Sequence, residues 1–337
     1  MKKKIILTIS VIMLIAAGAA WWGWRYINAS YHGAAVWVYI PAGSSPDAVG
    51  DSLSAVLGGH IGGRVHNIWL RAAGDNPDAH GAYRILDGDK AVDIARRLKR
   101  RVQTPVRVTF NNIRTLEQLA ESVASQLEFN ENDFMTAVDS VLPGAGFRGR
   151  EEYPAAFIPD TYEFYWTVPA GKAVERLLDY RNRFWDDGKR ARARELGLSP
   201  VKVATLASIV EEETNVADER RIVARLYLNR LDRGMLLQAD PTVKWAVGDF
   251  SLRRILNKHL AVQSPYNTYI HKGLPPGPIR IPDKRTLEAV LDAPAHGYLY
   301  MWAKEDFSGR HNFAVDYAAH QRNAMRYQSA LNHRNIR

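Results

Sequence analysis

The stretch SPVKVATLASIVEEE, residues 199–213, decides how the C-terminal half of this chain should fold. Ser199 followed by Pro200 is typical of a helix start, because a serine side chain caps the first turn and proline fits the first helical position. Apolar residues then recur at helical spacing, at Val203, Leu206, Ala207 and Val210. The pattern predicts a helix from Pro200 to Glu213 that packs one face on a core and ends in three glutamates.

The three glutamates should have different surroundings. At about 100° per residue, Glu213 borders the apolar stripe, Glu211 lies to one side of it and Glu212 faces away. Burial and two neighbouring negative charges should raise the pKa of Glu213, as a general acid near neutrality requires. Glu211 could bond the backbone or a neighbouring side chain, and Glu212 should be solvated. The alternative is an ordinary solvated acidic run, but acids at a helix C-terminus oppose the helix dipole, so we expect groups that hold them.

The N-terminus has the pattern of a membrane span. No charged residue occurs from Ile5 to Trp24, and 20 residues at about 1.5 Å each match the ~30 Å hydrocarbon core of a bilayer. Lys2–Lys4 precede this stretch, which favours a cytoplasmic N-terminus. We therefore expect a cytoplasmic stub at 1–4, an anchor at 5–27 in the inner membrane, and a body on the periplasmic side. A signal peptide cleaved near Ala16–Ala20 is the alternative, but the apolar stretch continues past that site.

An internal repeat appears at an offset of 70 residues. The strand pattern of Val36–Ile40 matches that of Val106–Phe110, and Ser45 matches Thr115 as the cap of a following helix. The simplest account is two related strand–helix units, at about 34–74 and 104–144, although short capped helices can also look alike by chance. Between them, Gly81–Ile85 reads as a strand and Asp89–Arg101 as a helix, so the fold class is α+β.

Aromatic residues concentrate between positions 153 and 166, interleaved with acids. Rings and carboxylates together suit a carbohydrate cleft, in which sugar faces stack on rings and hydroxyl groups bond to carboxylates. An aromatic-rich edge of the core explains the same composition equally well. The aromatic residues are Tyr153, Phe157, Tyr162, Phe164, Tyr165 and Trp166.

Composition excludes several classes of function. The chain has 337 residues and a net charge of +9. It contains no cysteine, and this absence excludes disulfide scaffolds, cysteine-ligated metal sites and thiol catalysis. His311 and His320 are separated by nine positions without a nearby ligand partner, so we expect no metal and no cofactor. The basic residues are scattered and the body is expected outside the cytoplasm, which argues against nucleic acid as a partner.

Several motifs together resemble the YceG-like endolytic murein transglycosylases (the MltG family). They occur in the family's order and extend from the N-terminal anchor to the C-terminus. The motifs are Phe157-Ile-Pro-Asp-Thr-Tyr162, Leu206-Ala-Ser-Ile-Val-Glu-Glu-Glu-Thr214, the run from Asp218 to Asn229, Leu237-Gln-Ala-Asp-Pro-Thr242, Tyr266-Asn-Thr-Tyr269, Gly273-Leu-Pro-Pro-Gly-Pro-Ile279, and a tail with His311, Phe313 and His320.

The resemblance implies a domain plan and a set of site residues. It implies a transmembrane helix, a LysM-like α/β region at 34–144 and a mixed α+β catalytic domain at 145–337. The family's catalytic glutamate corresponds to Glu213, the residue that helix geometry also selects. The motif positions expected to contact substrate are Glu211, Gln238, Asp240, Asn267, Tyr269, Asp160, Tyr162 and His311.

The resemblance also implies an activity, the non-hydrolytic cleavage of peptidoglycan between MurNAc and GlcNAc to leave 1,6-anhydroMurNAc ends. Glycan strands and the membrane are the expected partners, with peptidoglycan synthases as a further candidate. Two alternatives stay open. Asp240 or Asp160 could serve as the second carboxylate of a hydrolytic muramidase, or the chain could be a non-catalytic wall-binding scaffold, against which the intact Glu213 argues.

Overall fold

The computed structural model describes residues 2–75, 77–252 and 254–334. The chain forms two compact units. The first comprises residues up to Val108 together with Gln126–Phe129 and Tyr162–Val168. The second comprises Thr109–Ser125, Asn130–Thr161 and the chain from Pro169 onward. Helices and strands are mixed in both units, as the α+β expectation requires.

The first unit begins with the apolar helix α1, Lys2–Ile27. Its segment Lys3–Ile27 is long and apolar enough to cross a membrane, and none of that window is buried inside the protein. A run of uncovered apolar side chains is stable in lipid rather than in water. This helix is therefore well suited to membrane anchoring.

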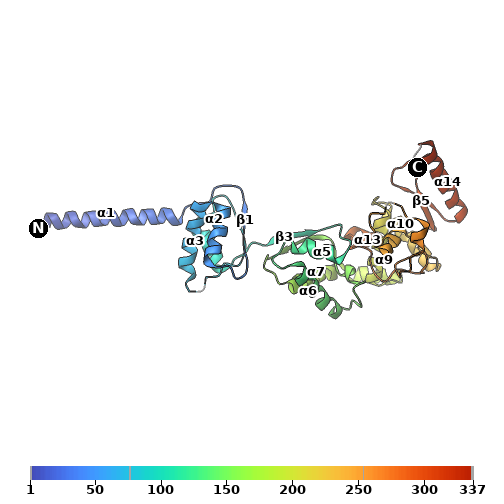
Figure 1. The fold of residues 1–337 in the computed structure, drawn as a ribbon, viewed down its shortest axis with the longest axis horizontal. Coiled ribbons are helices and arrows are strands. Elements are labelled where there is room, and N and C mark those ends of the chain that lie inside the picture. Colours follow the sequence, from blue (N-terminus) through green and yellow to red (C-terminus); the bar gives the residue numbers. More distant parts are fainter. Residues whose placement is uncertain (1, 76, 253, 335–337) are drawn as a thin grey trace. The chain divides into compact units, whose positions relative to one another are not determined.

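The rest of the first unit is a small α/β layer. Strand β1 (Val36–Ile40) pairs antiparallel with β2 (Gly81–Ile85), so that Val36 lies opposite Ile85. Helices α2 (Pro46–Leu57) and α3 (Gly59–Ala73) pack together beside β1 (Figure 1). Helix α4 (Ala91–Arg100) packs on α3. The core between these elements includes the fully buried side chains of Leu53 and Trp69.

One order of elements occurs twice in the chain. After α4 the chain forms β3 (Val106–Phe110), α5 (Leu116–Ala124), α6 (Glu131–Gly144), β4 (Asp160–Phe164) and α7 (Ala170–Phe184), with β3 paired to β4. This repeats the order strand, helix, helix, strand, helix of the first copy. Ser45 and Thr115 both cap their helices, accepting hydrogen bonds from the backbone N–H groups of Ala48 and Gln118. The expected strands and caps are confirmed at both positions.

The second unit is built around helix α9, Pro200–Glu213. Ser199 caps it as expected, accepting a hydrogen bond from the N–H of Lys202 at 3.3 Å. Helices α10 (Arg220–Asp232), α11 (Asp240–Val247) and α13 (Lys284–Leu291) pack against α9, and the ribbon shows α9, α10 and α13 gathered together (Figure 1). Shorter elements in the same unit are η1 (Tyr153–Ala156), α8 (Asp187–Glu195) and α12 (Asn257–Leu260).

Helix α9 is not the amphipathic helix with one buried face that its sequence predicted. Every residue from Val203 to Glu211 is buried, because neighbouring helices surround it. The small polar residues Thr205 and Ser208 escape solvent by bonding backbone carbonyls of the same helix. The prediction that one face of α9 is apolar and the opposite face is exposed to solvent is therefore wrong.

The C-terminal part adds a hairpin and a helix. Strand β5 (Tyr300–Ala303) pairs antiparallel with β6 (His311–Ala314), with Ala303 opposite His311. Helix α14 (Tyr317–His333) packs on both strands. This arrangement brings His311 and the face of β5 toward the end of α9, where a cavity forms.

Candidate active site

A cavity of about 530 Å³ lies in the second unit beside the C-terminal end of α9. Cavities of this size accommodate small molecules or short segments of a polymer. Five of the nine site residues predicted from the sequence line it: Glu213, Gln238, Asp240, Tyr269 and His311. The other lining residues are Leu226, Tyr227, Arg230, Leu237, Tyr300, Met301, Trp302, Ala303, Tyr317, His320 and Tyr327.

Glu213 is the ionisable group best suited to proton transfer in this cavity. Burial raises the pKa of its carboxyl group to about 7, and the negative charges of Asp240 and Glu212 act in the same direction. The Tyr227 hydroxyl donates a hydrogen bond to Glu213 Oε1 at 2.8 Å and, with the charge of Lys244, limits the rise. A carboxyl group with a pKa near 7 can both give and take a proton at neutral pH.

Asp240 places a second carboxylate on the same cavity. It is the first residue of α11, where the helix dipole favours a negative charge. The Tyr269 hydroxyl donates to Asp240 Oδ1 at 2.6 Å. Burial raises the pKa of Tyr269, and the hydrogen bond to Asp240 adds to the effect, so the phenol stays protonated and remains a donor. Glu213 and Asp240 therefore differ in environment, as groups with separate roles would.

Asn267 does not line the cavity but supports the loop that carries Tyr269. It is fully buried, and its side-chain amide donates to the carbonyl groups of Leu260 and Val262 at 2.9 Å. Its Oδ1 accepts from the backbone N–H of Tyr269 at 3.0 Å. Asn267 thus holds the loop that presents Tyr269 to Asp240.

Gln238 adopts a strained backbone conformation at the cavity wall, with φ at 55°. A non-glycine residue in this region costs free energy and is often held in place at a functional site. Its side-chain Oε1 accepts a hydrogen bond from Arg230 Nη2 at 2.6 Å, which leaves the Gln238 amide NH₂ able to donate elsewhere. Burial lowers the pKa of Arg230, whose guanidinium also lies 5.6 Å from the Tyr300 ring centre.

Rings from β5 and α14 form another wall of the cavity. His320 stacks on Tyr300 at 5.1 Å between ring centres and meets Trp302 edge-on at 5.3 Å. Burial lowers the pKa of His320, so its ring is neutral at pH 7. Its Nδ1 is buried and has no hydrogen-bond partner among the described residues. His311 is held by the buried Glu219, which lies 2.9 Å from His311 Nδ1.

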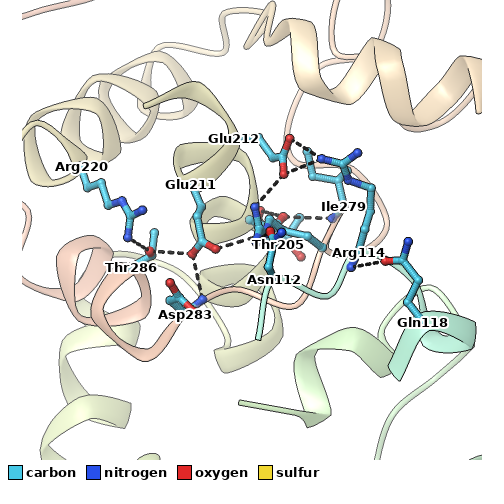
Figure 2. A network of polar contacts seen from close by, with 12 residues as sticks. Asn112, Arg114, Gln118, Thr205, Glu211, Glu212, Arg220, Ile279, Asp283 and Thr286 are labelled. Atoms are coloured by element: carbon cyan, nitrogen blue, oxygen red, sulfur yellow. Dashed lines mark hydrogen bonds and ion pairs between the residues drawn. The ribbon is translucent and has the colours of Figure 1, made fainter. Parts of the chain in front are cut away.

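Glu211 and Glu212 do not line the cavity. Their carboxylates lie in a polar network instead (Figure 2). Glu211 is buried and accepts hydrogen bonds from the Asp283 backbone N–H at 2.8 Å and the Thr286 hydroxyl at 2.7 Å. Arg280 Nε lies 3.1 Å from Glu211 Oε1. Glu211 thus fixes the end of the helix and does not line the cavity. The family resemblance had predicted that it contacts the substrate.

Glu212 corrects the sequence-based expectation, because its side chain is not solvated. It forms ion pairs with Arg114 at 2.8 Å (Figure 2) and with Arg280 at 2.8 Å. Only 17% of the Glu212 side chain is exposed. The helix-wheel argument failed because loops carrying Arg114 and Arg280 cover the face of α9 that the sequence pattern left for water. The expectation that some group must hold acids at this helix end is confirmed.

Asp160 and Tyr162 also lie away from the cavity lining. Tyr162 is buried, as are Tyr153, Phe157 and Phe164, so this aromatic segment mostly forms a core edge rather than an open cleft. The Tyr180 hydroxyl bonds to the Asp160 carboxylate.

Sequence reasoning missed Tyr227, Arg230, Tyr300, Trp302 and the role of His320 in the cavity. Tyr227 and Arg230 occur in the Asp218–Asn229 region or directly after it, but nothing in their spacing indicated the cavity.

Comparison with known proteins identifies the family to which this chain belongs. The fold and the site define an α+β protein with an apolar N-terminal helix and an aromatic-rich cavity that holds two carboxyl groups. The model of the YceG-like family matches residues 38–326, and the chain belongs to this family. A crystal structure of a YceG-like protein from Listeria monocytogenes shares the fold, with a TM-score of 0.57 and 24% identity over 86% of this chain and 98% of that one.

Two relatives carry the name endolytic murein transglycosylase. The Bacillus subtilis protein is 27% identical over 232 residues, which cover 64% of this chain and 64% of the relative. The protein from a serotype 2 strain of Streptococcus pneumoniae is 24% identical over 376 residues, covering 98% of this chain and 66% of the relative. The matches therefore span slightly less than two thirds of those relatives' lengths.

Proposed function

We propose that this chain is a membrane-anchored endolytic murein transglycosylase, with Glu213 as its single acid–base group. The observation that carries the proposal is the position of Glu213, a carboxyl group with a pKa of about 7 on an aromatic-lined cavity. The names of the two relatives support the same activity. Peptidoglycan glycan strands are the proposed substrate.

A transglycosylase needs one group that first gives and later takes a proton. Protonated Glu213 donates to the glycosidic oxygen between MurNAc and GlcNAc, and the bond from that oxygen to the muramyl C1 breaks. The resulting Glu213 carboxylate accepts the proton of the muramyl C6 hydroxyl as its oxygen bonds to C1. The product is a 1,6-anhydromuramyl end, no water is consumed, and the enzyme returns to its starting protonation state.

Asp240 is proposed to stabilise the positive charge that develops at the muramyl C1. Its carboxylate accepts a hydrogen bond from the Tyr269 hydroxyl at 2.6 Å, which holds it at the cavity. Gln238 and His311 are proposed to bind sugar hydroxyl or acetamido groups, since both line the cavity. Glu211, Asn267, Asp160 and Tyr162 are proposed to act indirectly, through packing and loop position.

The remaining parts of the chain fit a wall enzyme at a membrane. Helix α1 is proposed to anchor the chain in the inner membrane with residues beyond 28 on the periplasmic side, because Lys2–Lys4 lie at its N-terminal end. The strand–helix–helix–strand order in the first unit supports a LysM-like assignment for region 34–144, with 145–337 as the catalytic domain. Peptidoglycan synthases stay candidate partners.

Mass spectrometry of digested peptidoglycan tests the activity. The full chain in detergent micelles is incubated with purified peptidoglycan, with Glu213→Gln as the control. Anhydromuramyl ends that depend on Glu213 support a transglycosylase. Reducing ends instead indicate the hydrolytic muramidase, for which Asp240 is the remaining second carboxylate, and an absence of fragments indicates a scaffold.

A further inference from the structure

A second, smaller cavity in the same unit lies next to the other end of α11. It measures about 380 Å³ and has an aromatic floor made by Trp245, Phe250 and Tyr266. The ring centre of Trp245 is 5.7 Å from that of Phe250 and 5.8 Å from that of Tyr266. The remaining lining residues are Thr115, Leu116, Glu117, Arg150, Glu151, Pro154 and Pro278.

The rings are accessible, which separates this cluster from the buried aromatic core near Tyr153. Phe250 is 39% exposed, and Trp245 and Tyr266 are only partly buried. Leaving a phenyl ring in water costs free energy unless something covers it. The cluster therefore has the composition and exposure of a platform for a ligand.

The rim of this cavity is polar and carries both signs of charge. Glu117 and Glu151 offer carboxylate oxygens and Arg150 offers N–H donors. Burial raises the pKa of Tyr266 to about 12, and the negative charge of Glu151 adds to the rise, so the two groups are close. Rings that can cover a sugar face, next to groups that can bond its hydroxyls, suit a carbohydrate better than an anionic polymer.

Phe250 is held in place by the same network that holds α9. The Arg114 guanidinium carbon lies 4.5 Å from the Phe250 ring centre, a cation–π contact. Arg114 is in turn bound to both carboxylate oxygens of Glu212, at 2.9 and 2.8 Å (Figure 2). Two consecutive residues of α9 thus contribute to the two cavities. Glu213 lines the first cavity, and Glu212 binds Arg114, which contacts Phe250 in the second.

Helix α11 also links the two cavities. Its first residue, Asp240, lines the Glu213 cavity, and Trp245 lines the second. Five residues of helix rise about 7.5 Å along the axis, a distance that a short run of linked sugars can span. Lys244, which precedes Trp245, lies near enough to Glu213 for its charge to act on that carboxyl group.

We infer that the cavity of Trp245, Phe250 and Tyr266 is a second saccharide-binding site, which holds a glycan strand at a distance from the bond at Glu213. The inference rests on the proposed function, because it takes the glycan strand as the ligand. A site that holds the strand away from the cleavage point favours binding within long strands over binding at short fragments. It thereby supplies a structural basis for endolytic cleavage.

Binding measurements test the site independently of cleavage. The full chain carrying Glu213→Gln, in detergent, is titrated with peptide-free glycan strands of defined length. Adding Phe250→Ala should weaken binding of long strands about five- to tenfold, the loss expected for one ring contact. Phe250→Tyr keeps the ring and should restore binding. Met325→Ala removes another exposed apolar side chain of the same unit and should leave binding unchanged.

The outcomes separate this inference from the proposed activity. Equal binding by Phe250→Ala and its parent would overturn the second site, as would a Phe250→Tyr variant as weak as the alanine variant. Binding of a proline-rich peptide that depends on Phe250, with glycan binding unaffected, would also overturn it. If the otherwise unmodified chain releases no anhydromuramyl ends while strand binding still depends on Phe250, the saccharide site stands and the proposed activity fails.

Discussion

Glu213 is the last residue of α9, with its carboxyl group on the cavity and the Tyr227 hydroxyl 2.8 Å away. Its exceptional pKa follows from burial first and from neighbouring negative charges second. The sequence located this residue because the apolar pattern of α9 ends directly before it. The sequence could not locate Tyr227, Arg230 or Tyr300, because α10 and β5 bring these residues to the cavity through tertiary packing, which the local residue spacing does not record.

Glu213→Gln should lower the rate of glycan cleavage by about 10²–10⁴-fold, because glutamine can neither give nor take the catalytic proton. Glu195→Gln, an exposed glutamate at the end of α8, is the matched control and should retain activity. The rate of anhydromuramyl release measures both. A Glu213→Gln variant that folds and cleaves near the unmodified rate would remove Glu213 from the mechanism.

The same substitution should alter stability in a pH-dependent way. The pKa of Glu213 rises from 4.5 to about 7 on folding, so below pH 4.5 the group is protonated in both states and has no effect. As pH rises from 4.5 to 7 the unfolded chain ionises first, and native stability falls. Glu213→Gln should therefore be more stable than the unmodified chain above pH 7 and nearly equal at pH 4, as measured by urea unfolding.

Tyr227→Phe should shift the pH profile of cleavage. The acid must be protonated to begin the reaction, so kcat/KM should be level below about pH 7 and fall above it. The Tyr227 hydrogen bond stabilises the carboxylate, and its removal should raise the pKa of Glu213 and move the falling limb to higher pH. Tyr153→Phe, at a buried tyrosine that does not line the cavity, should leave the limb unmoved. An unchanged limb in Tyr227→Phe would contradict this role.

At the scale of elements, strands, caps and helix bounds follow closely from the sequence, whereas the surroundings of each helix do not. Pro200–Glu213, Val36–Ile40 and Gly81–Ile85 have the bounds that their local patterns predict. These patterns depend on neighbours within a few residues. The burial of α9 on all sides and the ion pairs of Glu212 depend on Arg114 and Arg280, which are distant in the chain.

Arg280→Met should destabilise the second unit by about 3–5 kcal/mol, because it leaves the buried Glu211 carboxylate without its cationic partner. It also removes an ion pair of Glu212. Arg96→Met, which breaks the exposed pair with Asp93, is the control and should cost less than about 1 kcal/mol. Urea unfolding of the full chain measures both. Equal effects of the two substitutions would show that the network in Figure 2 does not hold the end of α9.

For the whole molecule, α1 is the candidate membrane anchor, and under the proposed function it sets the side of the membrane on which cleavage takes place. A cavity suited to a wall polymer is useful only on the side of the membrane where that polymer lies. The uncharged run of α1 and the lysines before it are both readable in the sequence, since membrane insertion depends on composition and length rather than on distant contacts. Under the proposed topology, this N-terminal composition decides on which side of the membrane Glu213 lies.

The full chain should therefore stay with the inner membrane after a carbonate wash, with its body digested by protease added to spheroplasts. Leu14→Arg places a charge near the middle of the apolar run and should cost about 2.5–3.5 kcal/mol of insertion free energy, shifting part of the chain to the soluble fraction. Lys304→Arg, a conservative exchange in the body, should change neither result. A body protected from protease in intact spheroplasts would reverse the topology, and loss of an N-terminal tag during export would indicate a cleaved signal peptide.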